Sequence, residues 1–338
     1  MNMIRLSVVI LNWNGRKFLE KFLPPLVHSL PEYAEVVVAD NASTDDSLTF
    51  LQEHYPDIRI LRNERNEGFA RGYNLAMEQI DSEYFCLLNS DIEVTDHWIE
   101  PVIEMMDANE KIAVVQPKIL SYSQPEMFEY AGASGGFIDK YGYPFCRGRV
   151  FSTLEKDEGQ YDDPIDIFWA TGAAMFVRSD VYRTMGGLDG DFFAHMEEID
   201  FCWRIKNAGF KIKVCPQSSV LHVGGGTLPK NNSFKTYLNF RNNLFLLLKN
   251  LPDNRLAKTF ILRFFLDQIA AVFFLLQFHV KDFMAVYKAM LSFAKHYKEC
   301  KAKRNTMPKL AYTDVYDGSV VFLNYFKRKR HFDGTKFF

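Results

Sequence analysis

The fold is decided by the stretch Tyr84-Phe85-Cys86-Leu87-Leu88-Asn89-Ser90-Asp91-Ile92-Glu93-Val94. Its first half is apolar and aromatic, which is typical of a buried strand. The run stops at Asn89-Ser90-Asp91, so a carboxylate stands at the carboxyl end of that strand, where open α/β sheets bind ligands. Asp91 beside short polar side chains is the kind of oxygen site that Mg²⁺ or Mn²⁺ prefers. The alternative is a turn whose polar side chains bond only to nearby backbone groups.

The charge of the chain is unevenly distributed. The chain has 338 residues, enough for one large α/β domain and an appendage. Residues 1–254 carry 24 Lys and Arg against 36 Asp and Glu, whereas residues 255–338 carry 16 against 6. These parts have net charges of -12 and +10, which add up to the -2 of the whole chain. An acidic body with a basic, Phe-rich tail predicts that the tail meets an anionic surface.

The cysteines and the first residues indicate the compartment. The five cysteines are scattered, odd in number and without a C-x-x-C pair. This pattern favours a reducing compartment over a disulfide framework or a zinc site. The first apolar run, Leu6–Leu11, is too short for a signal peptide and lacks a cleavage pattern. We therefore expect it to be the first core strand of a cytoplasmic protein.

Four apolar runs alternate with helical segments over the first ninety or so residues. The predicted strands are Leu6–Leu11, Glu35–Ala39, Ile58–Leu61 and Tyr84–Leu88, and the helix Gly68–Ile80 precedes the last of them. Strands that alternate with helices at this rhythm predict a parallel sheet with crossover connections.

A polar side chain follows each of these runs. The residues are Asn12, Asp40, Asn63 and the pair Asn89 and Asp91. In a doubly wound sheet these positions share one edge, so they favour a polar ligand in one crevice over four independent turns. Neither a G-x-G-x-x-G motif nor a P-loop follows the first strand. If phosphates bind here, a metal and basic side chains must replace the glycine loop.

Three local patterns give further expectations. Pro24-Pro25 should kink or shorten the helix that follows the first strand. Ser43 or Thr44 should cap a helix that begins at Asp45-Asp46. Residues 120–165 are rich in Gly, Tyr, Pro and acidic residues, which predicts an irregular insertion with a hairpin.

A second polar cluster lies on a predicted helix that begins near residue 196. Glu197, Asp200 and Arg204 fall on adjacent turns, while Phe201 faces inward. The three carboxylates of Glu197, Glu198 and Asp200 repel one another, so at least one should have a raised pKa, as suits a general base. Arg204 can neutralise part of the cluster or hold a phosphate. The alternative is a solvent-facing acidic helix start.

His222 stands at a predicted strand end, before the glycines 224–226. A lone histidine is more often structural than a ligand. Here the glycines permit a close backbone approach, and a neutral imidazole could complete a metal shell begun by Asp91.

The chain changes character after about residue 234. Tyr237–Leu248 and Lys258–Tyr297 are helical in pattern and unusually apolar. Arg263, Asp267 and Gln268 interrupt the apolar run, so it is a poor match to a transmembrane span of about 20 residues. An amphipathic helix lying in the membrane plane fits better.

This region also has other interpretations. The helices could fold onto the catalytic domain or form the interface of a homodimer. The cluster at residues 327–330 could bind lipid headgroups or remain a solvated tail.

Taken together, the motifs resemble the GT-A-fold glycosyltransferases of family 2, and most closely the bacterial rhamnosyltransferase-like members that build surface polysaccharides. The resemblance covers roughly residues 4–230. It rests on five stretches that occur in the family's order: Ser7–Asn14, Val38–Ser47, Asn66–Asn74, Leu88–Asp91 and Glu197–Arg204.

The resemblance implies an α/β fold with a mostly parallel sheet flanked by helices. Residues 1–232 would be the catalytic domain, with a nucleotide-sugar half at 1–118 and an acceptor half at 119–232. Beyond the resemblance, the apolar helical pattern and basic charge of the last part of the chain predict that residues 233–338 are a helical, basic, membrane-associated appendage.

The resemblance also implies how the donor is held. Asp40 would contact the base or ribose of a nucleotide-sugar, and Asn12 and Trp13 would line the nucleoside pocket. Arg71 and Asn74 would help to hold the donor. To these the strand-end and helix patterns add Asn63, Asn89 and Arg204.

For the chemistry, Asp91 would be the metal carboxylate of a D-x-D-type motif, with Asn89 in place of the first Asp. Glu198 stands where the family has the Asp of a Glu-Asp pair, the base of an inverting displacement, while Glu197 and Asp200 remain alternatives. His222 matches a late metal or diphosphate ligand.

The expected enzyme is an inverting glycosyltransferase that uses Mg²⁺ or Mn²⁺ and a nucleotide-diphosphate sugar, with dTDP-rhamnose as one candidate. Its acceptor would be a lipid-linked or growing surface glycan at the inner face of the cytoplasmic membrane, and no nucleic acid is expected as a partner. The alternatives are a sugar nucleotidyltransferase or a non-catalytic, membrane-attached scaffold.

Overall fold

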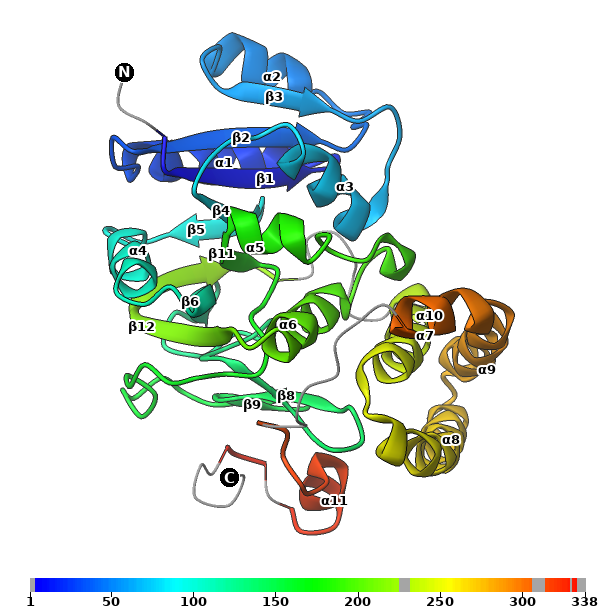
Figure 1. The fold of residues 1–338 in the computed structure, drawn as a ribbon. Helices are drawn as coiled ribbons and strands as arrows, with labels where there is room; N and C mark the ends of the chain where they lie inside the picture. Colours follow the sequence, from blue (N-terminus) through cyan, green and yellow to red (C-terminus); the bar gives the residue numbers. More distant parts are fainter. Residues whose placement is uncertain (1–3, 225–231, 306–313, 329, 333–338) are drawn as a thin grey trace.

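The computed structural model describes residues 4–224, 232–305, 314–328 and 330–332, and its centre is an eight-stranded mixed sheet (Figure 1). In spatial order, the strands are β3 (Arg59–Arg62), β2 (Ala34–Asp40), β1 (Leu6–Asn12), β4 (Tyr84–Asn89), β11 (Ala174–Arg178), β6 (Ile112–Ser121), β12 (Lys211–His222) and β5 (Ile92–Val94).

The first four strands are parallel, as the sequence predicts. β1 pairs in parallel with β2 and with β4, and β2 pairs in parallel with β3. Beyond β4 the sheet becomes mixed, because β11 runs antiparallel to both β4 and β6. The register places Asn12 opposite Asp40, and Leu11 opposite Asn89, so the polar strand ends meet at one edge of the sheet.

Helices cover both faces of this sheet. Val8 and Val9 of β1 point to opposite faces and belong to two separate hydrophobic clusters. The Val8 cluster includes side chains of α1 (Arg16–His28), α2 (Ser47–His54) and α4 (Glu100–Asp107). The Val9 cluster includes side chains of α3 (Gly68–Met77), α5 (Ser179–Thr184) and α6 (Glu197–Asn207). Burial on both faces explains why the strands read as continuous apolar runs.

Helix α1 continues through Pro24 and Pro25 to His28, so the expectation that the prolines shorten it is wrong. The prolines are tolerated because the carbonyls left without an N–H partner belong to Glu20 and Lys21, which face solvent.

Helix α2 begins at Ser47, later than predicted. Neither Ser43 nor Thr44 caps it, because the Ser43 hydroxyl accepts from Asn12 Nδ2 and from the Asn14 N–H, and the Thr44 hydroxyl donates to Asn14 Oδ1.

The insertion at 120–165 contains the predicted hairpin. β7 (Gly136–Ile138) pairs antiparallel with β8 (Pro144–Cys146), and the short strands β9 (Arg149–Val150) and β10 (Thr153–Leu154) extend a second, four-stranded sheet. At the other end of the domain, β12 is one long strand with register shifts, and it ends at His222 as the sequence predicts. Gly225 and Gly226, which follow it, lie outside the described residues.

The C-terminal residues lie in two places. Helices α7 (Ser233–Asn250), α8 (Asp253–Leu276), α9 (Val280–Lys295) and α10 (Tyr297–Asn305) gather beside α6 (Figure 1). α11 (Val320–Tyr325) instead docks on the β7–β8 hairpin, where the Val320 N–H donates to Asp139 and the Tyr316 N–H donates to Ile138. Of the predicted basic cluster at 327–330, Lys329 lies outside the described residues.

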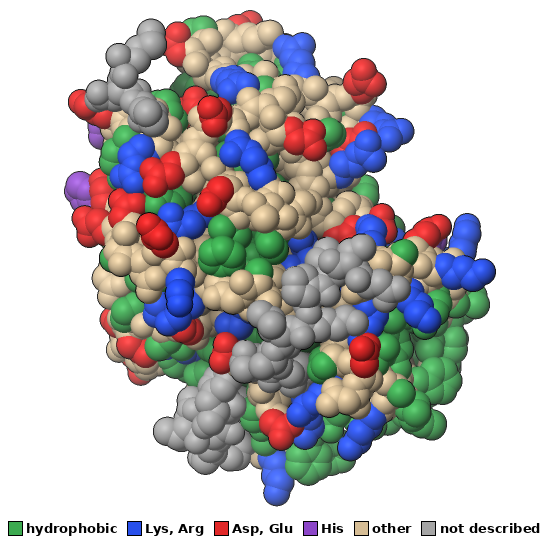
Figure 2. Space-filling view, in the orientation of Figure 1, with side chains coloured by type: hydrophobic (Ala, Val, Ile, Leu, Met, Phe, Trp, Pro, Cys, Tyr) green, Lys and Arg blue, Asp and Glu red, His purple; other side chains and the backbone are tan. Residues whose placement is uncertain are grey.

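Helices α8 and α9 expose a broad apolar surface, which forms the green area at the right of Figure 2. Its exposed members are Ile261, Phe264, Phe265, Ile269, Val272, Phe273, Leu275, Leu276, Phe278, Val280, Met284 and Leu291. Within the described ranges, α8 alone is long and apolar enough to cross a membrane by length and composition.

Candidate active site

The first part of the site lies where β1 and β2 end. Asn12 Nδ2 donates to Asp40 Oδ1 (3.2 Å), and the Ser43 N–H donates to the other carboxylate oxygen of Asp40 (3.1 Å). The side chains of Asn12 and Asp40 are buried. Asn12 Oδ1 is also buried and has no hydrogen-bond partner in the described part of the chain. A buried acceptor left in this way is satisfied by a ligand or by water.

Three further residues that the sequence predicts to bind the donor are Trp13, Asn63 and Arg71. Trp13 is 43% exposed beside this pair, so its ring is accessible to a planar ligand group. Asn63 donates from Nδ2 to Asn41 and thereby helps to fix the loop after β2. The side chain of Arg71 is 56% exposed and pairs with Glu67 (3.1 Å).

The second part of the site is the pair of Asp91 and His222. β12 and β5 pair antiparallel with His222 opposite Ile92, so the strand end meets the residue that precedes β5. As a result, His222 Nε2 lies 3.2 Å from Asp91 Oδ1, and both side chains are buried. A carboxylate oxygen and an imidazole nitrogen held this close are suitable ligands for a divalent cation.

Glu129 completes the environment of His222, although its sequence carries no recognisable signal. Its Oε2 lies 2.9 Å from His222 Nδ1, on the side of the ring that faces away from Asp91. Glu129 belongs to the irregular insertion, where the sequence shows neither periodicity nor a motif. Burial acts to lower the pKa of His222, but the hydrogen bonds that its ring donates to Asp91 and Glu129 raise it to about 10. A cation that binds Nε2 would therefore displace the proton from that nitrogen.

This arrangement brings together two side chains, those of Asp91 and His222, that could hold a metal. Within the described residues, no group of three His, Cys, Asp or Glu side chains is arranged to hold an ion alone. The two ligands therefore fit a cation that takes its other ligands from a bound diphosphate and water, as Mg²⁺ commonly does.

The third part of the site is the start of α6. Glu197 is buried and Glu198 is half-buried, and Oε2 of each is shielded from solvent without a hydrogen-bond partner among the residues described. Burial raises the pKa of Glu198 to about 7. Burial, with the charge of Glu198, raises the pKa of Glu197 well above its usual range. A carboxyl group with a pKa near 7 is suited to general-base catalysis.

Close approaches join the three parts. A Cβ on Gly15 would lie 2.3 Å from Asn12 Oδ1 and 3.5 Å from Ser90 Oγ, so the turn after β1 touches the residue before Asp91. The Asn89 N–H donates to the carbonyl of Ala173 (2.9 Å). A Cβ on the preceding Gly172 would lie 4.0 Å from Glu198 Cβ. The start of α6 therefore borders the same sheet edge as Asn89-Ser90-Asp91.

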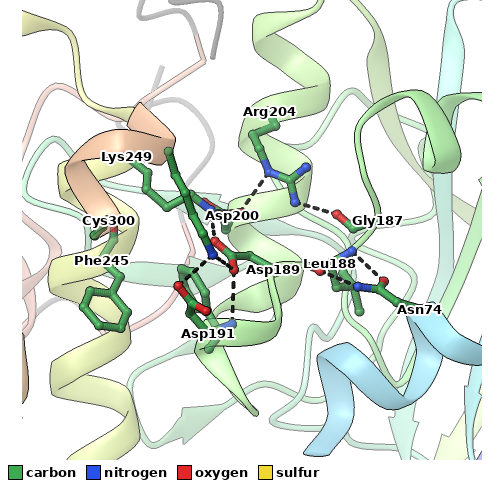
Figure 3. A network of polar contacts seen from close by, with 12 residues as sticks. Asn74, Gly187, Leu188, Asp189, Asp191, Asp200, Arg204, Phe245, Lys249 and Cys300 are labelled. Carbon is green, nitrogen blue, oxygen red and sulfur yellow. Dashed lines mark hydrogen bonds and ion pairs between the residues drawn. The ribbon is translucent and has the colours of Figure 1, made fainter. Parts of the chain in front are cut away.

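Asp200 and Arg204 lie away from this edge, in a buried ionic network (Figure 3). Arg204 Nε donates to Asp200 (2.9 Å), and its two other nitrogens donate to the carbonyls of Met185 and Gly187. Lys249 Nζ lies 2.7 Å from Asp200 and 2.6 Å from Asp189. Although burial acts to raise the pKa of Asp200, Lys249 and Arg204 lower it. These contacts favour a structural role over the catalytic and donor-binding roles that the sequence predicts.

Asn74 is also engaged within the protein. Its Nδ2 donates to the carbonyl of Leu188 (2.7 Å), and its Oδ1 accepts from the Leu188 N–H (2.9 Å) and from Tyr182 (2.7 Å), as Figure 3 shows for Leu188. These bonds hold the segment before α6 against α3, so the contact favours a structural role here too.

Comparison with known sequences places these features in a family. The model of glycosyl transferase family 2 matches residues 7–184. The chain is 24% identical to a low-salt glycan biosynthesis hexosyltransferase of Haloferax volcanii, over 70% of this chain and 73% of that protein. It is also 24% identical to an N-acetylglucosaminyl-diphospho-decaprenol L-rhamnosyltransferase of Mycobacterium tuberculosis, over 64% of this chain and 75% of that protein. The chain is 22% identical to the E. coli rhamnosyltransferase WbbL, over 64% of this chain and 82% of that protein.

Solved structures support the fold. GalNAc-T7 with UDP, GalNAc and Mn²⁺ superposes with a TM-score of 0.60 at 18% identity and covers 75% of this chain. This chain spans about half of the GalNAc-T7 chain, at 49%. S. aureus TarS 1–349 with UDP-GlcNAc gives 0.55 at 16% identity, over 88% of this chain and 83% of that chain. The predicted GT-A fold is thus confirmed, and the family match favours a transferase over the nucleotidyltransferase and scaffold alternatives.

Proposed function

Because this chain belongs to glycosyl transferase family 2, we propose that it moves a sugar from a nucleotide-diphosphate donor to a glycan acceptor with inversion of configuration. Glycosyl transfer itself follows from the family. The inversion, the dependence on a divalent cation and the nature of the acceptor are the proposal. The observation that carries it is the half-buried carboxyl group of Glu198, with its raised pKa, beside the edge that holds Asp91 and His222.

Glu198 acts as the base. The acceptor hydroxyl is a poor nucleophile, so Glu198 takes its proton as the oxygen attacks the anomeric carbon. Attack from the side opposite the diphosphate inverts the configuration. Glu197 is buried beside Glu198, and burial together with the charge of Glu198 raises its pKa well above the usual range, which favours its neutral form and limits the negative charge next to the base.

The diphosphate lies at the Asp91 and His222 pair. These two side chains would hold a Mg²⁺ or Mn²⁺ ion, which neutralises the leaving group when it is bound. Asn89 and the backbone around Ser90 border the sugar. The nucleoside lies toward Asn12, Asp40 and Trp13, with Asp40 accepting from the ribose or base and Trp13 stacking on the base.

One set of assays can test the identity of the donor, the metal-binding role of Asp91 and the role of Glu198 as the base. A panel of dTDP-, UDP- and GDP-sugars, with dTDP-rhamnose included, would be assayed for turnover with Mn²⁺, with Mg²⁺ and with a chelator. We expect one nucleotide class to be turned over only with metal. Asp91→Ala and Glu198→Gln should each lower that turnover by at least about 10²-fold without changing the melting temperature by more than a few degrees. Turnover that survives in both variants would contradict the proposal.

We further propose that the acceptor is lipid-linked and that the α8–α9 surface binds an anionic membrane. Residues 255–338 carry a net charge of +10, and an apolar face among basic residues is typical of a helix pair that lies on a membrane. Arg263 and Asp267 form a buried pair (3.0 Å) that faces the protein, and Arg263 donates to the Tyr141 carbonyl. The charges that interrupt the apolar run therefore point inward, and the helix lies in the plane of the membrane.

Vesicle flotation tests the membrane proposal. The double variant Leu276→Glu/Phe278→Glu alters the most exposed end of the surface, where Phe278 is 90% exposed. We expect it to lose binding to vesicles that contain anionic lipid, while Val27→Glu, an exposed apolar site on α1, serves as the matched control. Equal flotation of wild type and double variant, or a change in oligomeric state alone, would contradict membrane binding.

A further inference from the structure

We infer that Asn242 of α7 is a positioning residue that fixes the turn carrying the catalytic base. Its side chain is fully buried, and the two hydrogens of its Nδ2 are shared among three backbone carbonyls in one turn: Phe192 (2.9 Å), Ala194 (2.9 Å) and His195 (2.7 Å). The turn leads directly into Glu197 and Glu198. The inference rests on the assignment of the base proposed above.

The backbone of this turn is strained. Phe193 has φ 65° and ψ −60°, and the Ala194 N–H donates to the Phe192 carbonyl (2.7 Å), which together form a classic γ-turn. His195 and Met196 follow with φ of 68° and 72°. Residues other than glycine rarely adopt such backbone angles. Three of them within four consecutive positions are stable only where surrounding contacts hold the backbone in place.

Helices α7 and α3 hold this turn through hydrogen bonds to its backbone carbonyls. Arg241 donates to the carbonyls of Asp191 and Phe192 (both 3.0 Å). The remaining carbonyl, that of Phe193, accepts from the backbone N–H groups of Phe69 and Ala70 at the start of α3. Every carbonyl from residue 191 to residue 195 is therefore bonded to α7 or α3, and Asn242 supplies the bonds to three of the five.

The orientation of the amide is itself fixed. Arg241 Nε donates to Asn242 Oδ1 (2.8 Å), so the nitrogen of Asn242 must face the turn. About two turns further along α7, Asn250 and Lys249 bond to Asp200 of α6. Helix α7 thus contacts both the turn that leads into α6 and the first turn of α6 itself.

The consequence is that the C-terminal helices set the position of the base. Met196 is the residue before α6, so a rotation in the turn moves the carboxyl group of Glu198 relative to the sheet edge. A misplacement of about 1 Å at a reacting group is enough to slow a reaction about 10²-fold. Among the described residues, none of the hydrogen bonds that Arg241 and Asn242 make to this turn reaches Asn12 or Asp40, so donor binding should be unaffected.

Asn243 provides a matched control. It neighbours Asn242 on α7, is also buried, and donates from Nδ2 to the carbonyl of Gly142 (2.7 Å), in the β7–β8 hairpin. Asn242→Leu and Asn243→Leu would be compared in the full-length protein. The readouts are kcat and donor KM for the nucleotide-sugar that wild type turns over, and amide hydrogen exchange.

We expect Asn242→Leu to lower kcat about 10²-fold with donor KM within about twofold, and to speed exchange in residues 192–200. Asn243→Leu should keep kcat and speed exchange near residue 142 only. If Asn242→Leu does not fold, Arg241→Met removes two bonds to the turn and the bond to Asn242 Oδ1 from a half-buried position, and it should lower kcat in the same way, by a smaller factor.

Equal kcat in the two Asn→Leu variants, or a loss confined to donor KM, would overturn the inference while leaving the base assignment intact. Full activity of Glu198→Gln would instead overturn both.

Discussion

His222 Nε2 lies 3.2 Å from Asp91 Oδ1, because the antiparallel pairing of β12 with β5 brings the end of one strand to the start of the other. This contact is the basis of the proposed cation site. We expect Asp91→Asn, which keeps the shape but removes the charge, to weaken Mn²⁺ binding in the presence of nucleoside diphosphate by at least tenfold. Isothermal titration would measure this loss, and an unchanged affinity would exclude Asp91 as a ligand.

Glu129 should tune the same site from behind the imidazole. Its carboxylate contacts His222 Nδ1 (2.9 Å), and partners of this kind orient a metal-binding histidine. Glu129→Gln is expected to reduce metal affinity by about 10- to 100-fold, and the effect should be recovered by excess Mn²⁺ in the assay. A rate loss that no Mn²⁺ concentration restores would point to a different role for Glu129.

The raised pKa of Glu198 predicts the pH dependence of turnover. Below about pH 7 the carboxyl group is protonated and accepts no proton, so kcat should rise with pH and level off above that value. Glu198→Gln should lower kcat by at least about 10²-fold. Its residual rate should lose this pH dependence. A wild-type profile that is flat from pH 5 to pH 8 would contradict the assignment.

The carboxyl group of Glu198 should make the folded protein less stable as pH rises, whereas it makes turnover faster. Its folded pKa of about 7 lies above the ordinary value of 4.5, so its contribution to stability is fully present below pH 4.5 and is lost as pH rises through 7. Glu198→Gln removes that loss. We therefore expect the variant to melt at a higher temperature than wild type at pH 8 and at a similar temperature at pH 4.5, as measured by calorimetry.

The network around Asp200 should matter for folding more than for donor binding. Lys249→Met leaves the buried carboxylate of Asp200 with less compensation, which costs about 3–5 kcal/mol when a buried pair is broken. Chemical denaturation would measure this. The double variant Lys249→Met/Asp200→Asn should recover part of the loss, whereas a single variant as stable as wild type would show that the network contributes little.

Much of this arrangement could be predicted from the sequence. The apolar runs that end in Asn12, Asp40 and Asn89 fixed the parallel half of the sheet, because burial on both faces leaves a continuous pattern. The order of the motifs predicted the family, and the crowded carboxylates predicted a raised pKa at the start of α6.

The rest depends on contacts between distant residues. Glu129 lies in an irregular segment and acquires its role only by meeting His222. Asp200 and Arg204 share a helix face with Glu197, but Asp200 pairs with Lys249 of α7 in the core. The strained turn before α6 is set by Asn242, and no local pattern in residues 190–196 reveals its carbonyl contacts.

The central claim is that a divalent cation at Asp91 and His222 links the protein to the diphosphate of its donor. The most direct measurement is the affinity for the nucleoside diphosphate of the preferred donor, with Mn²⁺ and with EDTA, in wild type and in Asp91→Ala. The account predicts that Mn²⁺ strengthens binding to wild type at least tenfold and has no effect on the variant. Equal affinity with Mn²⁺ and EDTA in wild type would contradict it.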